Sequence, residues 1–187
     1  LWIIRMAGMQ PSRNLLAEIE RGLVNASLDA AAVVKFSGFE FRKYNNRLYL
    51  LTPVFSTGDA QTFDWCPRQP LRIPDLDLQL SAAHPAGSSD DAFLLAQALI
   101  DVALIDETLT VRFRQGGERI HPAGRGHSQS LKKLFQEASI PPWERDVMPL
   151  LYLNDELIAV GDLWVAKQFS ACPGEAGWSL QLSRVTD

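Results

Sequence analysis

Two short segments carry the pattern of a β-hairpin, and they limit most strongly how this chain can fold. Strand-forming residues at 41–44 and 47–50 flank Asn45-Asn46, and apolar runs at 150–153 and 157–160 flank Asn154-Asp155. Asn and Asp tolerate the positive φ that tight turns between antiparallel strands require. A helix pattern precedes the first hairpin, because Ser12 is a typical N-cap and apolar residues then recur at helical spacing to about residue 24. We therefore predict an α+β fold of short helices and antiparallel strands.

The remaining elements follow from apolar periodicity and from proline and glycine. We predict strands at 33–36, 39–42, 76–80, 109–114 and 163–165. A helix begins at Ser128 or Ser130 and ends before Pro141-Pro142, and these two prolines can start a further short helix. Four prolines make residues 52–74 irregular, and residues 94–105 fit a helix or strands equally. We place the boundary between two small domains near residue 107, which gives domains 1–107 and 108–187.

Composition narrows the class of protein. The 187 residues are 47% hydrophobic and 21% charged, which excludes a disordered chain. No apolar run approaches the roughly 20 residues that span a bilayer, so we predict no membrane association. Two cysteines suit a reducing cytoplasm, where we expect the protein. Because the sequence begins at Leu1 rather than Met, we expect it to be part of a longer protein.

Charge is distributed unevenly along the chain. The net charge is −4, yet residues 74–108 contain seven acids and no Lys or Arg, whereas residues 112–133 contain six bases and one acid. A polyanion responds to the local patch, because salt screens charges beyond about 8 Å. The six bases are Arg112, Arg114, Arg119, Arg125, Lys132 and Lys133. This segment predicts contact with phosphates, with an ordinary solvated face as the alternative.

Two features of this basic segment favour phosphate binding. Alternation in 109–114 places Arg112 and Arg114 together on the exposed face of a strand. A glycine-rich loop at 116–126 then leads into a helix, and glycines let backbone amides approach a phosphate. The Gly-x-x-x-x-Gly-Lys-Ser/Thr spacing of a nucleotide-binding P-loop is absent. The alternative is a flexible loop followed by a capped helix.

Other candidate sites are weaker. His121 and His127 share the glycine-rich loop but lack the further ligands of a metal site, so we predict no metal and no catalytic residue in this chain. Asp75, directly before the predicted strand at 76–80, and Asp77 fall on the same face of that strand, with nothing nearby to complete a two-metal site. Tyr44 and Tyr49 belong to a core or stack on unpaired bases, and we favour the core.

Several motifs resemble one known family. They are Gly-Gly-Glu-Arg-Ile-His-Pro-Ala-Gly-Arg at 116–125, Leu-Lys-Lys-Leu-Phe-Gln-Glu at 131–137 and Pro-Pro-Trp-Glu-Arg-Asp at 141–146. In this order and spacing they resemble the C-terminal domain of bacterial tRNA(Ile)-lysidine synthetase. Gly-Phe-Glu-Phe-Arg-Lys-Tyr at 38–44 and Arg-Leu-Tyr-Leu at 47–50 resemble that family's middle, substrate-binding domain. The resemblance is thin over 52–107, and Gln129 and Val147 depart from the family pattern.

The resemblance implies a ligase that uses ATP, with Mg²⁺, to join lysine to C2 of the wobble cytidine of isoleucine tRNA. Its catalytic loop, Ser-Gly-Gly-x-Asp-Ser, is absent here, so the resemblance implies a tRNA-recognition region that needs the N-terminal catalytic domain and is inactive alone. It implies phosphate contacts for Arg119, Arg125, Lys132, Lys133 and Arg145, and more weakly for Arg42, Lys43 and Arg47.

Two other interpretations stay open. In the first, the chain is a scaffold module without an RNA partner, in which Arg112 and Arg114 pair with the acidic stretch 75–107. In the second, which we rank last, His121, His127 and nearby acids form a metal-dependent hydrolase. The sequence also leaves open whether the chain forms a homodimer.

Overall fold

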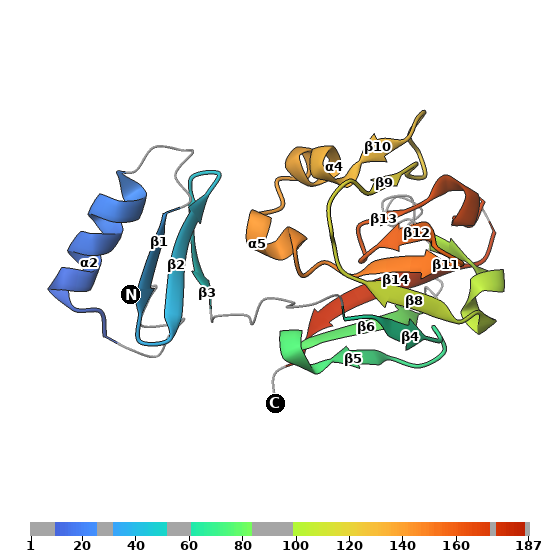
Figure 1. Cartoon of the computed structure of the whole chain (residues 1–187), viewed down its shortest axis with the longest axis horizontal. Helices are drawn as coiled ribbons and strands as arrows, with labels where there is room; N and C mark the ends of the chain where they lie inside the picture. The colour runs from blue at the N-terminus through green and yellow to red at the C-terminus, as the bar shows by residue number, and fades with distance from the viewer. Residues whose placement is uncertain (1–9, 26–31, 52–60, 84–98, 173–174, 186–187) are drawn as a thin grey trace. The chain divides into compact units, whose positions relative to one another are not determined.

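The computed structural model describes residues 10–25, 32–51, 61–83, 99–172 and 175–185. These residues form short helices and antiparallel sheets (Figure 1), which confirms the predicted α+β class. The chain divides into two units, residues 1–55 and 56–187. We describe each unit by itself.

The described residues of the first unit form one helix and one three-stranded sheet. Helix α2 (Arg13–Ile19) continues into a wider helical turn, η1 (Glu20–Val24), and Ser12 caps it by accepting a hydrogen bond from the Leu15 amide at 3.1 Å. The sheet has the order β1-β2-β3. Its strands are β1 (Val33–Phe36), β2 (Phe39–Tyr44) and β3 (Arg47–Leu51). Asn45 and Asn46 adopt φ of 45° and 60°, which confirms the predicted turn.

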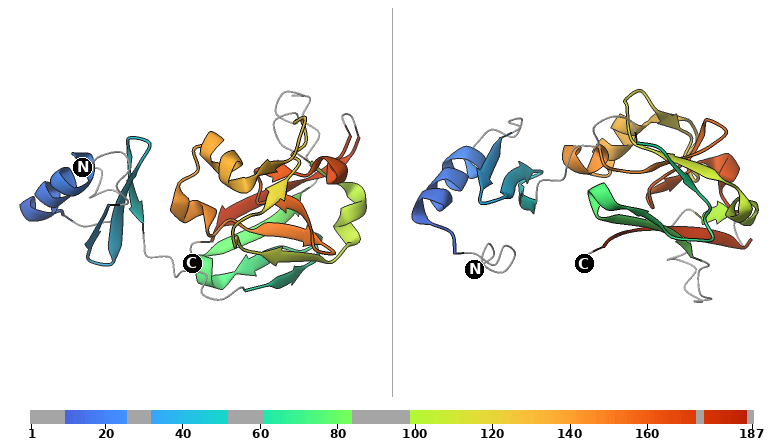
Figure 2. Two further views of the ribbon diagram at one scale, coloured as in Figure 1. Left: turned by 45° about the horizontal axis from the view of Figure 1, so that its top comes forward. Right: turned by 60° about the horizontal axis from the view of Figure 1, so that its bottom comes forward.

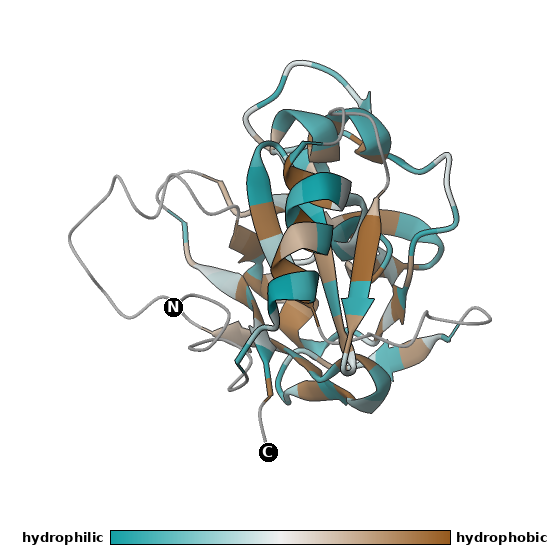
Figure 3. Cartoon of the chain, turned by 90° about the vertical axis from the view of Figure 1, so that its left-hand side faces the viewer, coloured by the Kyte–Doolittle hydropathy of each residue, from teal (hydrophilic) through white to brown (hydrophobic). Residues whose placement is uncertain are grey.

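One face of the helix packs on this sheet. Leu15, Ile19 and Leu23 recur at helical spacing and are buried against Val34 and Phe41 of the sheet. In Figure 3, the ribbon changes between hydrophobic and hydrophilic residues within single helices and strands, as elements with one buried face require. The helix predicted from Ser12 to about residue 24 and the strands at 33–36 and 39–42 are therefore confirmed.

The second unit is a sandwich of two antiparallel sheets (Figure 2). The five-stranded sheet has the order β13-β12-β11-β8-β4, with β4 (Phe63–Trp65), β8 (Leu109–Arg112), β11 (Leu150–Leu153), β12 (Glu156–Val160) and β13 (Trp164–Val165). The four-stranded sheet has the order β5-β6-β14-β7, with β5 (Leu71–Ile73), β6 (Leu78–Ala83), β7 (Leu99–Asp101) and β14 (Gly177–Arg184). Short helical turns η2 (Pro74–Leu76), η3 (Val102–Asp106) and η4 (Lys167–Phe169) connect them.

A small layer lies outside the five-stranded sheet. It consists of the strand pair β9 (Arg119–Ile120) and β10 (Gln129–Ser130) and the helices α4 (Leu131–Glu137) and α5 (Pro142–Arg145). Successive side chains of β11 point to opposite faces of the five-stranded sheet and so belong to two different cores. Leu151 belongs to the core between the two sheets, and its neighbour Leu150 packs with Leu134 and Phe135 of α4 in a second core. The second hairpin, the strand at 163–165 and both helices were predicted, and the structure confirms them.

The described strands within residues 56–107 pair with strands of the second unit. Strand β4 pairs with β8, and β6 and β7 both pair with β14 near the end of the chain. The structural division therefore falls at residues 55 and 56 and differs from the boundary expected near residue 107. These strands are short and pair with distant segments, so local sequence patterns could not assign them to a unit.

Two further expectations differ from the structure. Strand β6 begins only at Leu78, because Pro74 starts the turn η2 and Asp77 adopts a left-handed φ of 51°. Asp75 and Asp77 therefore do not share a strand face. Part of the undecided segment 94–105 lies outside the described residues, and its described part forms β7 and η3. None of the helices in the described ranges has the length and hydropathy that a membrane-spanning segment requires.

Candidate nucleic-acid interface

Arg112 lies on the face of β8 that points away from the sandwich core, as alternation predicted. Leu109 and Val111 of the same strand are fully buried in that core. The Arg112 guanidinium donates a 2.6 Å hydrogen bond to Asp155 Oδ1 in the turn of the second hairpin. It also lies 4.8 Å from the centre of the Tyr152 ring. This arginine is therefore exposed but already paired with a carboxylate.

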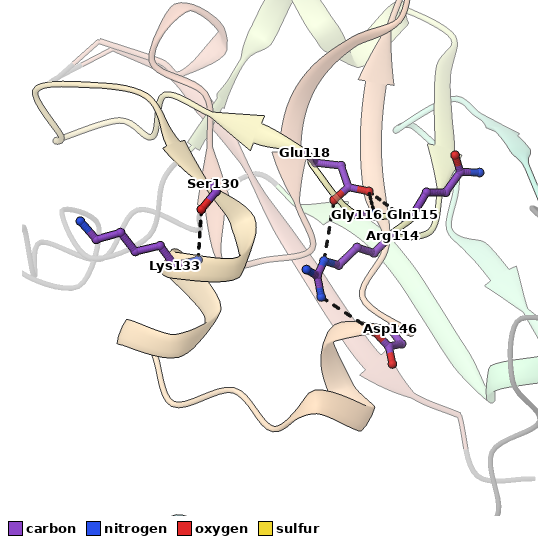
Figure 4. A network of polar contacts seen from close by, with 7 residues as sticks. All are labelled: Arg114, Gln115, Gly116, Glu118, Ser130, Lys133 and Asp146. Atoms are coloured by element: carbon purple, nitrogen blue, oxygen red, sulfur yellow. Dashed lines mark hydrogen bonds and ion pairs between the residues drawn. The ribbon is translucent and has the colours of Figure 1, made fainter. Parts of the chain in front are cut away.

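Arg114 belongs to a network that fixes the start of the glycine-rich loop (Figure 4). Glu118 Oε1 accepts hydrogen bonds from the backbone amides of Gln115 at 2.6 Å and Gly116 at 2.7 Å. Its other oxygen, Oε2, lies 3.7 Å from Arg114 Nε, and Asp146 lies 4.0 Å from Arg114 Nη1. The Arg114 side chain is 19% exposed. This network holds the loop in place and leaves little of the Arg114 charge for a ligand.

Arg125 and Lys133 share a single carboxylate. Arg125 Nη1 lies 2.7 Å from Glu137 Oε2, and Lys133 Nζ lies 3.7 Å from Glu137 Oε1. The hydrogen bond from Arg125 lowers the pKa of Glu137, and the charges of Arg125 and Lys133 act in the same direction. Because such exposed ion pairs contribute little to stability, a phosphate can compete for both cations. The group carries a net charge of +1.

Within the basic segment 112–133, Arg119 and Lys132 have the least neutralised charges. Arg119 donates from Nη2 to the Ser128 carbonyl at 3.0 Å, and Lys132 is exposed on α4. Within the described ranges, no carboxylate oxygen lies within 4.0 Å of either cationic group. Ser130, one of the two predicted caps, begins α4 and accepts from the Lys133 amide. These two side chains offer the most accessible positive charge in the second unit's basic segment.

Arg145 has a different position from the other predicted residues. It is only 9% exposed, and its Nε donates a 2.7 Å hydrogen bond to the Ile140 carbonyl. Pro141 caps α5 and Pro142 begins it, so the guanidinium ties the segment that follows α4 to the next helix. The geometry gives Arg145 a structural contact and little surface for a phosphate.

The predicted residues of the first unit lie on its hairpin. Arg42 donates to Glu40 Oε2 at 2.6 Å, and Lys43 donates to the Val24 carbonyl at 2.8 Å. Arg47 is exposed at the start of β3. Lys35, which the sequence analysis did not select, also pairs with Glu40 at 3.0 Å. Arg42 and Lys43 therefore have contacts within the unit, and Arg47 is the most exposed of the three.

The contacts of Glu40 lead us to expect that the first unit loses stability at acidic pH. Hydrogen bonds from Arg42 and then from Lys35 lower the pKa of this buried carboxyl. A lowered pKa in the folded state adds stability that is present above the unfolded pKa of about 4.3 and is lost as the pH falls through the folded value. Urea unfolding of the chain, followed by NMR signals of Tyr44 and Tyr49, should show this loss below about pH 4.5. Glu40→Gln should be less stable at pH 7 and should flatten the dependence; an unchanged acid dependence would contradict this role.

Sequence reasoning missed a cleft beside β9. The cleft has a volume of about 400 Å³ and lies among β9, β12 and the segment after β13. Its lining includes Arg119 and His121, which the sequence singled out, and Lys167, Gln168 and Glu156, which it did not. The Lys167 amide donates to the His121 carbonyl at 2.8 Å, and Pro122 pairs with Ala166. Only this non-local pairing brings these residues together, so no spacing in the sequence could reveal the cleft.

The histidines and acids form no metal centre in the part of the chain that the structure describes. Within those ranges, no three His, Cys, Asp or Glu side chains gather as metal ligands do. Instead, His121 Nε2 lies 2.8 Å from the Arg125 carbonyl, and Asp75 accepts from the Gln61 side chain. These contacts stabilise loops.

Comparisons with known proteins agree with the motifs. Residues 109–182 match the family model described as the TilS substrate C-terminal domain. The chain is 33% identical over 181 residues to a tRNA(Ile)-lysidine synthase of Coxiella burnetii, an alignment that covers 97% of this chain and 38% of the relative. It is 32% identical to the tRNA(Ile)-lysidine synthase of Edwardsiella ictaluri, which covers 98% of this chain and 39% of that protein. The chain thus spans less than two fifths of the length of these relatives.

A solved structure supports the same relationship. The fold resembles that of a crystal structure of a TilS C-terminal domain, with a TM-score of 0.52 and 25% sequence identity, over 69% of this chain and all of that one. The family match contains β8, the glycine-rich loop and α4, where most of the predicted contact residues lie. Residues 109–182 thus match the TilS substrate C-terminal domain, and nearly the whole chain aligns with part of the tRNA(Ile)-lysidine synthases, the family that its motifs resemble.

Proposed function

We propose that this chain is the tRNA-recognition part of a tRNA(Ile)-lysidine synthase. In this role it holds isoleucine tRNA while a catalytic domain outside this chain uses ATP and Mg²⁺ to join lysine to C2 of the wobble cytidine. The chain alone then performs no ligation, because its sequence lacks the Ser-Gly-Gly-x-Asp-Ser loop. Its proposed partners are isoleucine tRNA and that catalytic domain. Its proposed location is the cytoplasm. The observation that supports this most is the family match over the segment that carries the exposed cations.

We rank the proposed contact residues by how far neighbouring acids neutralise them. In the second unit, Arg119 and Lys132 come first, because no described carboxylate neutralises them. Arg125 and Lys133 come second, since they share one acid that a phosphate can displace. Arg112 and Arg114 keep their carboxylate partners and contribute less, and Arg145 supports the α4–α5 connection. In the first unit, Arg47 and then Arg42 and Lys43 form a separate, weaker contact.

This ranking fits recognition of RNA by shape. Double-stranded RNA offers proteins phosphates and 2′-hydroxyls more readily than base edges, so a few exposed cations on a rigid support are sufficient for affinity. Helix α4 and the loop before it provide this support, because Leu131, Leu134 and Phe135 are fully buried beneath them. The specific choice of tRNA then depends on the whole enzyme.

The scaffold interpretation expected a different set of ion pairs. It required Arg112 and Arg114 to pair with acids of the stretch 75–107. In the described residues they contact Asp155, Glu118 and Asp146 instead, and Asp106 of that stretch pairs with Arg68. The described residues therefore lack the ion pairs between these two arginines and the stretch 75–107 that would favour the scaffold interpretation.

Titration with RNA tests the proposal. Gel-shift titrations of the chain with an isoleucine tRNA transcript and with duplex DNA of equal length should show tighter binding of the tRNA, because the proposal assigns these cations to an RNA backbone. Equal affinity for the tRNA and the duplex DNA would mean that the chain binds polyanions in general and does not recognise tRNA. Absence of tRNA binding near 50 mM salt would contradict it.

A further inference from the structure

The cleft beside β9 is built differently from the exposed cations on α4. Its floor contains the apolar residues Ile120, Leu157 and Ala166, of which Ile120 and Ala166 are buried. Its rim contains the positive side chains Arg119 and Lys167, both exposed. A volume of about 400 Å³ falls in the range of about 300–1,000 Å³ that is typical of small-molecule sites. The cleft therefore suits a small ligand with one flat apolar part and one anionic part.

Hydrogen bonds hold the walls of the cleft in place. Across the β9–β10 pair, Arg119 Nη2 donates to the Ser128 carbonyl at 3.0 Å. The Lys167 amide donates to the His121 carbonyl at 2.8 Å, and the Ala166 amide donates to the Ile158 carbonyl at 2.8 Å. His121 Nε2 lies 2.8 Å from the Arg125 carbonyl, which fixes the ring. These bonds within the protein fix the walls of the cleft, which reduces the entropy cost of binding.

The electrostatics of the cleft favour an anion at its rim. Among the described residues that line the cleft, Glu156 is the one acid, and its carboxylate accepts a hydrogen bond from the Gln168 side chain. In the described part of the chain, no carboxylate lies within 4.0 Å of the cationic groups of Arg119 or Lys167. The rim therefore carries a net positive charge, and the Glu156–Gln168 pair adds polar groups that can contact a base edge.

We propose that this cleft takes one unpaired nucleotide of the bound RNA. Its phosphate contacts Arg119 and Lys167, and its base lies on the apolar floor beside the His121 ring. Proteins commonly bind unpaired bases by stacking on flat side chains, histidine included, and by pairing the phosphate with Lys or Arg. A duplex is too wide for a cleft of this size, so the ligand is a splayed-out or terminal nucleotide. This inference rests on the proposed function and assigns to the cleft a ligand class within it.

Binding of a single nucleotide tests the cleft directly. In NMR titrations of ¹⁵N-labelled chain, 5′-AMP should shift the amide signals of Ile120, Lys167 and Gln168 most. Lys167→Ala should weaken AMP binding about tenfold, the loss expected for one charge-assisted phosphate contact. Adenosine and inorganic phosphate should each bind at least fivefold more weakly than AMP. Shifts located elsewhere, an unchanged affinity in Lys167→Ala, or phosphate binding equal to that of AMP would overturn the proposal.

A second arm separates an RNA nucleotide from a free one. Lys167→Ala should weaken tRNA binding about threefold to tenfold, and AMP should compete with tRNA only partially, because other contacts remain. Arg72→Ala, which removes an exposed arginine of β5 in the other sheet, is the matched control and should change neither affinity. If AMP binds the cleft but tRNA affinity is unaffected by Lys167→Ala, the site takes a free nucleotide and the inference fails. If tRNA binds and AMP does not, the inference fails while the proposed function stands.

Discussion

Replacing Arg119 and Lys132 together with alanine is expected to weaken tRNA binding about 30- to 100-fold near 50 mM salt. Each cation loses one charge-assisted contact to a phosphate, and one such contact contributes about 1–1.5 kcal/mol. No described carboxylate lies within 4.0 Å of either group, so their removal leaves no buried or unpaired acid behind. Gel-shift titration with an isoleucine tRNA transcript measures the loss.

Two variants make this result specific. Arg72→Ala removes a cation from β5, which lies on the opposite side of the second unit from α4 (Figure 1), and should leave tRNA affinity unchanged. Arg112→Ala should have a smaller effect than either Arg119→Ala or Lys132→Ala, because Asp155 already pairs with Arg112. A double variant that binds tRNA as well as the wild type would remove Arg119 and Lys132 from the interface.

Phe135→Ala should cost the second unit about 3–5 kcal/mol of unfolding free energy. Phe135 is fully buried, packs with Leu150 and Val160 of the five-stranded sheet and lies 5.5 Å from the Trp164 ring. Truncation leaves a cavity in the core beneath α4, and such cavities carry this cost. In thermal unfolding followed by tryptophan fluorescence, the midpoint should fall by roughly 10–20 °C.

The matched control for this variant is Phe36→Ala. Phe36 is 37% exposed in the first unit, so its truncation should leave the second unit's transition within about 1 °C of the wild type. A Phe135→Ala chain with an unchanged transition would show that the layer of α4 is not part of the second unit's cooperative core. Because α4 carries Lys132 and Lys133, that result would also weaken the view that the contact residues sit on a rigid support.

Local elements of this protein could be predicted from its sequence. Asn45-Asn46 and Asn154-Asp155 both adopt positive φ at hairpin turns, Ser12 and Ser130 cap helices, and Leu109 and Val111 share the buried face of β8. Each of these features depends on a residue's own backbone preference or on a period of two or 3.6 residues. Such information is present within a few positions of the chain.

Long-range pairing was outside the reach of these patterns. Strands β4, β5 and β7 have three residues each, and β14 pairs with two segments that are remote from it in sequence. No pattern within a few residues specifies such pairing partners. The chain therefore divides between residues 55 and 56, and the sequence patterns had placed the boundary near residue 107. The cleft beside β9 has the same origin, since Lys167 meets His121 only through pairing between distant segments.

The net charge of a sequence segment overestimates the positive charge that is free in the fold, because acids from distant positions can pair with its bases. The segment 112–133 has a net charge of +5 in the sequence, but acids from outside it or at its centre neutralise part of this charge in the fold. Asp155 approaches Arg112, Asp146 approaches Arg114, and Glu137 lies between Arg125 and Lys133. The fold therefore concentrates the accessible charge at Arg119 and Lys132, a distinction that residue types alone do not make.

The salt dependence of tRNA binding tests the central claim most directly. If Arg119, Arg125, Lys132 and Lys133 each replace a counterion at a phosphate, the logarithm of the association constant should fall with the logarithm of salt concentration with a slope of about −3 to −4. In the Arg119→Ala, Lys132→Ala double variant the slope should become shallower by about 2. A wild-type slope near zero, or an identical slope in the double variant, would contradict phosphate recognition by this surface.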